Sequence, residues 1–335
     1  MTERRHVSVK DVAALCGVSF QTTSKVLNGK GSVSDATRAR ILRAAHDLGY
    51  VPNRQARSLV MRRTQTVGLL AGDLGDHALT ELIIGAEQEA RRQGYAVVIS
   101  SLGRDDTGFG DALPVLLEHR VDGILLAAPL VEDGLAAGQV RRVTVPLVSL
   151  HHLPGGGVAT VGSDHVLTGY LATAHLLARG RRTIATILGD RGRRVTQSRL
   201  RGYRLALEEA GRAIDEALVE EGGWDINRAF AATGRLLDRR PGIDAIFAQN
   251  DNMAIGVLSA LRARGVAVPA GCAVVGCDDI DIAAHTAPPL STVRIPFLET
   301  GKAAMRTLLK LIETSPDVPP KLLLPVELVE RASSV

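Results

Sequence analysis

The chain has 335 residues, of which 45% are hydrophobic and 23% are charged, and its formal net charge at pH 7 is +4. It has no apolar stretch of membrane length, and its polar N-terminus does not read as an export signal, so neither a membrane protein nor a secreted one is expected. The three cysteines, Cys16, Cys272 and Cys277, lack the spacing of a zinc site and favour small buried side chains in a reducing compartment.

Two short helical patterns separated by a tight turn open the chain. Gly17 stands where two steeply crossing helices need a positive φ, and Ser19 is placed to cap the second helix, over residues 20–28. The exposed face of that helix carries groups that suit base edges and thymine methyls. The residues expected to contact DNA there are Ser19, Phe20, Gln21, Thr22, Lys25 and Asn28. An ordinary helical hairpin is the alternative, but the coincidence of turn, cap and polar face favours a DNA-reading unit.

A third helix is predicted over residues 37–48, capped by Ser34 or Asp35 and ended by Gly49. A short helix over residues 53–61 follows, with Asn53 as its cap. Because its large apolar side chains are few, we do not expect this helix to be stable alone in water.

Charge is distributed unevenly along the chain. Residues 1–63 hold twelve Lys or Arg against four Asp or Glu, whereas the other 272 residues hold 28 basic against 32 acidic side chains. A basic run alone is usually a solvated surface. Here it coincides with the helix–turn–helix pattern, so it favours contacts with nucleic acid phosphates and salt-sensitive binding.

The sequence up to this point resembles the lactose-repressor (LacI) family of bacterial transcription factors. The resemblance rests on residues 9–13, 17–19, 26–29, 33–38, 48–53 and 56–59, and it extends over essentially the whole chain. It implies an all-α DNA-binding head at residues 1–52, a hinge helix at 53–63 and a two-lobed effector-binding and dimerisation core at 64–335.

The resemblance also implies roles for residues of the hinge. Asn53, Arg57 and Leu59 are expected to contact the operator, with Leu59 wedged between bases in the minor groove. A flexible Arg-rich linker, with Leu59 packed on the core, is the alternative. Two positions of the second helix depart from the family: Thr23 replaces a common valine, and Lys25 replaces a common arginine. Lysine lacks the planar fork with which arginine binds guanine, which leaves the operator sequence open.

Beyond residue 64, short apolar strands alternate with amphipathic helices. The strands are expected at residues 67–70, 96–99, 123–126, 147–150, 184–187, 245–248, 273–275, 321–324 and 326–330. The helices are expected near residues 79–93, 168–178, 199–210, 226–237, 253–264 and 299–312. Repeated βα units imply parallel sheets covered by helices on both faces, and two such series imply two α/β lobes with a cleft between them, as in periplasmic binding proteins. We expect the first lobe at about residues 64–161 and 291–324, and the second at about 162–290 and 325–331.

Ligands of open α/β sheets bind beyond the carboxyl ends of the strands. That rule selects polar residues that follow the predicted strands, namely Asp73, Asp76, His77, His151, Asn250 and Asp278. Each alone is more often a helix cap or a solvated loop residue, and Asp164 and Asp251 in particular are candidates for caps. Trp224, the only tryptophan, is predicted either to stack on a ligand or to belong to the core.

The family resemblance sharpens this prediction. It implies that Arg199 clamps the effector, that Asn250 and Asp278 bind effector hydroxyls, and that Trp224 and Phe297 cover the ligand. His151 stands where many members have aspartate, and residues 78–79 replace a frequent aromatic pair. Carboxylate, amide, guanidinium and aromatic groups together fit a sugar. A nucleobase or a phosphorylated metabolite remains open as effector, as does whether the effector releases DNA or acts as a corepressor.

The sequence therefore predicts a cytoplasmic, nucleoid-associated transcriptional repressor that binds palindromic double-stranded DNA as a homodimer. No terminal leucine heptad is present to form a tetramer. An enzyme is not favoured, because no catalytic residues, cofactor or metal site are predicted: residues 151–152, 278–279 and 155–157 lack the spacing of known catalytic motifs. A solute-binding protein shares two lobes but lacks the basic head.

Overall fold

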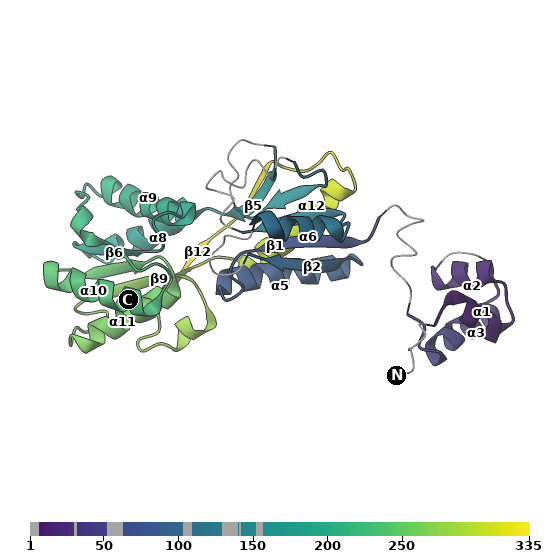
Figure 1. Cartoon of the computed structure of the whole chain (residues 1–335). Coiled ribbons are helices and arrows are strands. Elements are labelled where there is room, and N and C mark those ends of the chain that lie inside the picture. The colour runs from purple at the N-terminus through teal and green to yellow at the C-terminus, as the bar shows by residue number, and fades with distance from the viewer. Residues whose placement is uncertain are drawn as a thin grey trace. The chain divides into compact units, whose positions relative to one another are not determined.

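The computed structural model describes residues 7–29, 32–51, 63–102, 109–128, 140, 142–151 and 157–335. Contacts within the chain define two compact units, Met1–Thr64 and Gln65–Val335, whose elements are labelled in Figure 1. Within the described ranges, no helix has the length and apolar character needed to cross a bilayer. The predicted hinge residues Asn53, Arg57 and Leu59 lie outside the described residues.

The described residues of the first unit form the first three predicted helices, α1 (Val9–Cys16), α2 (Phe20–Leu27) and α3 (Asp35–Asp47). Ser8 and Asp11 cap α1 reciprocally, and Ser34 caps α3. Gly17 ends α1 in the left-handed conformation, with φ +62°, which turns the chain into α2. The buried core of this unit consists of Val12, Cys16, Val26, Ile41, Ala44 and Ala45.

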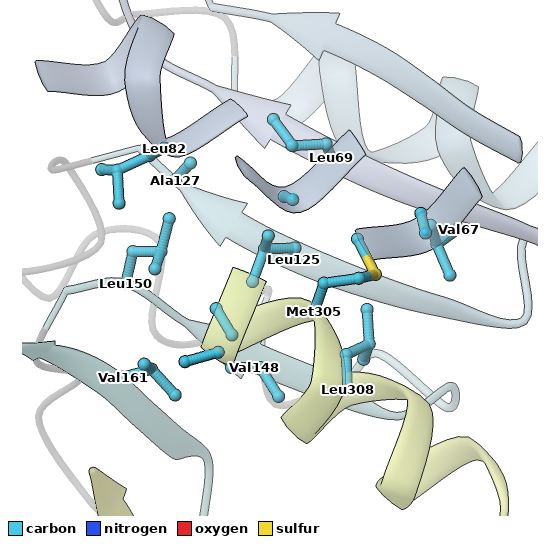
Figure 2. Close-up of a cluster of buried hydrophobic side chains, with 14 of the residues drawn as sticks. Val67, Leu69, Leu82, Leu125, Ala127, Val148, Leu150, Val161, Met305 and Leu308 are labelled. Carbon is cyan, nitrogen blue, oxygen red and sulfur yellow. The ribbon is translucent and has the colours of Figure 1, made fainter. Parts of the chain in front are cut away.

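The first lobe of the second unit is built on a parallel sheet with the strand order β11-β5-β4-β3-β1-β2. Its strands are β1 (Thr66–Ala71), β2 (Ala96–Ser101), β3 (Gly123–Ala127), β4 (Leu147–Ser149), β5 (Ala159–Ser163) and β11 (Lys321–Leu324). Helices α5 (His77–Arg92) and α12 (Phe297–Ile312) cover one face, where Met305 and Leu308 pack against Leu125 and Val148 (Figure 2). Helix α6 (Phe109–Glu118) packs on the other face through Leu116.

The second lobe repeats this plan with the strand order β12-β10-β9-β8-β6-β7. Its strands are β6 (Ile184–Leu188), β7 (Val219–Glu221), β8 (Ala245–Ala248), β9 (Ala273–Asp278), β10 (Ser291–Arg294) and β12 (Glu327–Val329). Its helices are α8 (His165–Ala178), α9 (Arg194–Glu209), α10 (Ile226–Arg239) and α11 (Asp251–Ala263), with 3-10 turns at Glu216–Leu218 and Asp281–His285. Only the pairing of β10 with β12 is antiparallel among the described strands. Two parallel-dominated sheets in two lobes confirm the predicted fold class.

In each lobe, one pair of helices packs closely because each helix has a glycine facing the backbone of the other. A Cβ at Gly169 of α8 would lie 1.9 Å from the Arg199 carbonyl oxygen, and one at Gly202 of α9 would lie 2.0 Å from that of Val166. Gly85 and Gly301 allow the same approach between α5 and α12. Because the obstructing atoms belong to the backbone, no side-chain rotation relieves such a contact. The α8–α9 contact fixes the backbone from which Arg199 projects.

The chain crosses between the lobes at places that differ slightly from those expected. Strand β5 continues to Ser163 in the first lobe, two residues beyond the expected boundary. Residues 291–294 were expected in the first lobe, but they form β10 of the second, with Ser291 opposite Val275 of β9. The expectation followed from their position just before the last helix. In the structure, pairing with β9 decides where this four-residue strand lies, and sequence periodicity does not reveal that pairing.

Candidate functional site

Helix α2 presents part of its predicted contact set to solvent. Phe20 is 50% exposed, and Gln21 and Lys25 are also exposed. Other members are engaged in the helix itself: Ser19 Oγ accepts the Thr22 amide at 3.1 Å, and Asn28 Nδ2 donates to the Ser24 carbonyl at 2.8 Å. The side chains of Phe20, Gln21 and Lys25 therefore give the exposed face of α2 an aromatic ring, an amide and an ammonium group, and the capping residues Ser19 and Asn28 are exposed at its two ends.

Thr23, the first departure from the family pattern, is buried in the head. Its hydroxyl donates to the Ser19 carbonyl at 3.1 Å. A threonine in this place keeps the branched shape of valine and satisfies its own hydroxyl within the helix. This departure therefore affects the core of the head and leaves the exposed face of α2 unchanged.

A cavity of about 430 Å³ opens in the second unit and takes its lining from both lobes. Its volume lies in the range of roughly 300–1,000 Å³ found for small-molecule sites. The predicted residues that line it are Asp73, Asp76, His151, Arg199, Trp224, Asn250, Asp278 and Phe297. His77, the first residue of α5, is not part of the lining. Eight predicted residues from seven separate segments of the chain thus line one cavity.

Arg199 is the centre of the second-lobe side of this cavity. Its side chain is only 4% exposed, and its guanidinium donates to the Gln249 carbonyl and to Asp278 Oδ1, the latter at 3.4 Å. The same group lies 5.7 Å from the centre of the Trp224 ring, within cation–π range. The arginine is therefore held in one orientation by an acceptor, a carboxylate and an aromatic face.

Trp224 combines a place in the core with a place at the cavity, and its stacking on a ligand stays a prediction. The ring packs against the core of the second lobe and also lines the cavity. It lies so close to Gly189 that a Cβ there would approach the ring to 2.0 Å. The glycine thus leaves room for the ring beside the end of β6.

The end of β9 is a strained and buried acidic turn. Asp278 has φ +116° and Asp279 has φ +61°, conformations that side-chain-bearing residues rarely adopt. The pKa of Asp278 is raised to about 6, chiefly by burial, with Arg199 opposing the shift and the nearby Asp76 reinforcing it. The turn brings a carboxylate with perturbed acidity to the cavity wall.

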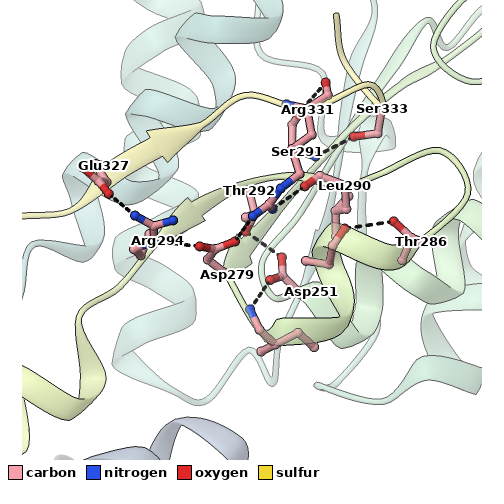
Figure 3. A network of polar contacts seen from close by, with 12 residues as sticks. Asp251, Asp279, Thr286, Leu290, Ser291, Thr292, Arg294, Glu327, Arg331 and Ser333 are labelled. Carbon is pink, nitrogen blue, oxygen red and sulfur yellow. Dashed lines mark hydrogen bonds and ion pairs between the residues drawn. The ribbon is translucent and has the colours of Figure 1, made fainter.

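Neighbouring ion pairs hold this turn in place (Figure 3). Asp279 accepts from Arg294 Nε and from Arg331, each at 2.7 Å, and Arg294 also pairs with Glu327. Since Arg294 and Glu327 flank two of the crossings between lobes, the same network joins the turn to the crossing segments. Solvent screens the pair between Arg294 and Glu327, whose side chains are 48% and 63% exposed, so the better-buried pair of Asp279 with Arg331 contributes more to holding the turn.

Of the two aspartates predicted as helix caps, Asp164 is confirmed and Asp251 is wrong. Asp164 caps α8, accepting the Val166 and Leu167 amides at 3.0 Å. Asp251 does not cap α11; Asn250 does so, accepting the Met253 amide at 2.8 Å. Asp251 points back into the sheet, where it accepts from the Thr292 hydroxyl at 2.7 Å and from the Ile280 amide at 3.0 Å (Figure 3).

First-lobe residues complete the cavity. Asp76 caps α5 through the Ala78 amide at 2.8 Å, and Asp73 Oδ1 accepts the Gly75 amide at 2.9 Å. Burial lowers the pKa of His151 to about 4, and Arg193 adds to the effect. His151 is therefore neutral near pH 7, and its ring is already hydrogen-bonded to the Ala127 backbone, whereas an aspartate in its place would offer only acceptors.

Several lining residues were missed by the sequence analysis, among them Ser163, His165, Arg193 and Thr300. Ser163 ends β5 and His165 begins α8, on either side of the capping residue Asp164. The strand-end rule that selected the other residues would have selected these two if β5 had been recognised. Burial lowers the pKa of His165 well below its ordinary value, with further contributions from Arg199 and His151.

A small-molecule cavity between two α/β lobes and a separate helix–turn–helix unit define a ligand-responsive DNA-binding class of protein. Residues 8–53 match the family model "Bacterial regulatory proteins, lacI family", and residues 173–334 match "Periplasmic binding protein-like domain". The HTH-type transcriptional regulator CelR of Thermobifida fusca is 37% identical over 341 residues, which cover 99% of this chain and 100% of CelR. The HTH-type transcriptional repressor PurR of Vibrio atlanticus is 33% identical over 327 residues, covering 97% and 98%.

Two solved structures are also similar. A complex of the transcriptional regulator CelR with cellobiose matches with a TM-score of 0.72 at 35% identity, covering 98% of this chain and 100% of that one. The lac repressor dimer bound to operator and the anti-inducer ONPF matches with a TM-score of 0.89 at 29% identity, covering 99% and 100%. The chain belongs to the LacI family of bacterial regulatory proteins. It is a DNA-binding transcriptional regulator and not an enzyme.

Proposed function

We propose that this protein is a repressor that binds an inverted-repeat operator as a homodimer and is switched by a sugar bound between its lobes. The observation that carries the proposal is the cavity in which Arg199 is held between Asp278 and the Trp224 ring. Two similar proteins support it: CelR in complex with cellobiose, and the lac repressor dimer on its operator with ONPF.

The chemistry of the cavity suits a polyol. A guanidinium donates hydrogen bonds to ligand hydroxyls and the carboxylate beside it accepts them, and such charge-assisted hydrogen bonds are stronger than neutral ones. Asn250 uses its Oδ1 as a helix cap, which leaves its NH₂ group to donate to a ligand. Trp224 and Phe297 supply apolar surface for the C–H faces of a sugar ring.

The proposed switch is a change in the arrangement of the lobes. Arg199, Asn250 and Asp278 belong to the second lobe, and Asp73 and His151 to the first. A ligand that contacts both groups stabilises one arrangement of the lobes, and in a dimer this alters the spacing of the two heads. The effect on DNA binding is limited by the difference in the ligand's affinity for the two arrangements.

A thermal-shift screen tests the effector class. Neutral sugars, acidic sugars, nucleobases and phosphorylated metabolites other than sugars are each added to the full chain. We expect sugars to raise the melting temperature of the protein. Stabilisation by nucleobases alone would exclude a sugar as effector.

Selection from random DNA with the same protein is expected to return an inverted repeat, because two heads related by a two-fold axis read the same half-site twice.

Substitutions on α2 separate base reading from phosphate contact. Gln21→Ala and Lys25→Ala are expected to flatten the selected sequence, each costing about 1–3 kcal/mol of discrimination at its own base position. Lys10→Ala, an exposed lysine on α1, is the control and is expected at most to weaken binding to all sequences alike. The readout is the enriched sequence for each variant. An unchanged preference in Lys25→Ala would show that α2 lies differently on DNA.

A further inference from the structure

Three buried polar atoms at the cavity have no hydrogen-bond partner among the residues that the structure describes. Seven buried side-chain nitrogen or oxygen atoms in the described residues lack a hydrogen bond, and three of them are Ser163 Oγ, His165 Nδ1 and Arg199 Nε. All three residues line the 430 Å³ cavity, and Ser163 is only 9% exposed. A buried polar atom without a partner costs about 1–3 kcal/mol. Their presence in the lining of one cavity indicates that a ligand supplies the missing partners.

Two of these residues also line a second cavity of about 650 Å³. The residues common to both cavities are Leu150, His151, Gly162, Ser163, His165 and Val195. Ser163 and His165 thus form a polar wall shared by two adjoining spaces. A ligand that satisfies both side chains lies at the junction of the two cavities, where it can occupy either space or both.

The lining of the second cavity is basic. It contains Arg194, Arg201 and Lys321, and its acidic member is Asp164, whose carboxylate already accepts two amides of α8. The unequal numbers of cations and acids favour an anion in this space.

Helix α9 adds to this preference. Residues 194, 195, 198 and 201 of the 16-residue helix line the cavity, so its first turn faces the space. The residue before the helix, Arg193, makes no capping hydrogen bond with its side chain. The amides of an uncapped first turn, together with the helix dipole, favour a negative group.

We propose that the effector spans both cavities and that its part in the second cavity is anionic, so that the effector is a sugar bearing a phosphoryl or carboxylate group. Ser163, His165 and Arg199 Nε then bind the oxygen atoms that lie between the ring and the anionic group. Arg194, Arg201 and Lys321 neutralise the charge. This inference rests on the proposed function, because the sugar ring occupies the first cavity.

The test is calorimetry on the full chain with matched ligands. Each neutral sugar of a panel is compared with its phosphate ester and its uronic acid, and inorganic phosphate is titrated alone. We expect one charged sugar to bind at least tenfold tighter than its neutral parent, with an advantage that falls as salt rises. Comparing the affinity of the phosphate ester with that of the uronic acid shows which anionic group the protein prefers. Equal binding of the neutral parent would overturn the second-cavity proposal and leave the sugar function standing, whereas no binding by any sugar would overturn both.

Substitutions in the lining test which residues cause the preference for the charged ligand. Arg201→Gln with Lys321→Gln is expected to remove most of the tenfold preference for the charged ligand while leaving affinity for the neutral parent unchanged. His165→Ala is expected to weaken both ligands, because it removes a contact at the shared wall. Arg262→Gln, an exposed arginine of α11 outside both linings, is the matched control and should change neither affinity. An undiminished preference for the charged ligand in the double variant would contradict the proposal.

Discussion

Arg199→Ala is expected to weaken effector binding about a hundredfold or more, because it removes charge-assisted hydrogen bonds worth about 1.5–3 kcal/mol each. The side chain also holds Asp278, so its loss leaves a buried carboxylate without its cation and favours the neutral acid. Calorimetry with the best sugar from the screen measures the loss.

A second arginine on the same helix provides the control. Arg204 pairs with the exposed Glu216 and lines neither cavity, so Arg204→Ala should keep the wild-type effector affinity. Binding of specific DNA without effector should remain nearly unchanged in both variants. Retention of wild-type effector affinity by Arg199→Ala would remove this residue from the site.

Gly202→Ala is expected to destabilise the second unit by about 2 kcal/mol or more, at the upper part of the range for overpacked cores. The new Cβ would lie 2.0 Å from the Val166 carbonyl oxygen and 2.6 Å from the Tyr170 amide nitrogen. Both atoms belong to the backbone of α8, so the two helices must separate. Since α9 carries Arg199, effector affinity should fall with stability. Thermal unfolding and calorimetry measure the two effects.

Gly234→Ala is the matched control, because it makes the same substitution inside another helix. Its Cβ would meet only the end of the flexible Arg264 side chain, at 3.4 Å. Replacing an unhindered helical glycine with alanine usually stabilises by up to about 1 kcal/mol. We therefore expect opposite signs for the two substitutions. A melting temperature of Gly202→Ala equal to that of wild type would show that the α8–α9 contact is not closed at this glycine.

The head was predictable because its signals are local. The turn at Gly17 and the caps Ser19 and Ser34 each act within four residues of the element that they define, and the structure contains all three. The cavity residues were predictable only in part from the residues themselves. The strand-end rule selected polar positions, but the importance of Arg199 and Phe297 came from the family resemblance, since neither directly follows a strand predicted from the sequence.

What the sequence analysis missed depends on contacts distant in the chain. Strands β5 and β10 have five and four residues, and their places are set by pairing with β4, β11 and β9. Without β5, Ser163 and His165 could not be recognised as residues at a strand end. The wrong prediction that Asp251 is a cap has the same origin, because its hydroxyl partner Thr292 lies on β10, 41 residues away.

The central claim is that one molecule couples a sugar site to DNA binding, and the most direct measurement is the affinity for the selected operator with and without the sugar. We expect saturating sugar to change the operator dissociation constant by at least about fivefold, the lower end of typical allosteric coupling, with little change for random DNA. Reciprocally, operator DNA should change the affinity for the sugar by the same factor. An operator affinity that is identical with and without a sugar shown to bind the protein would contradict the account.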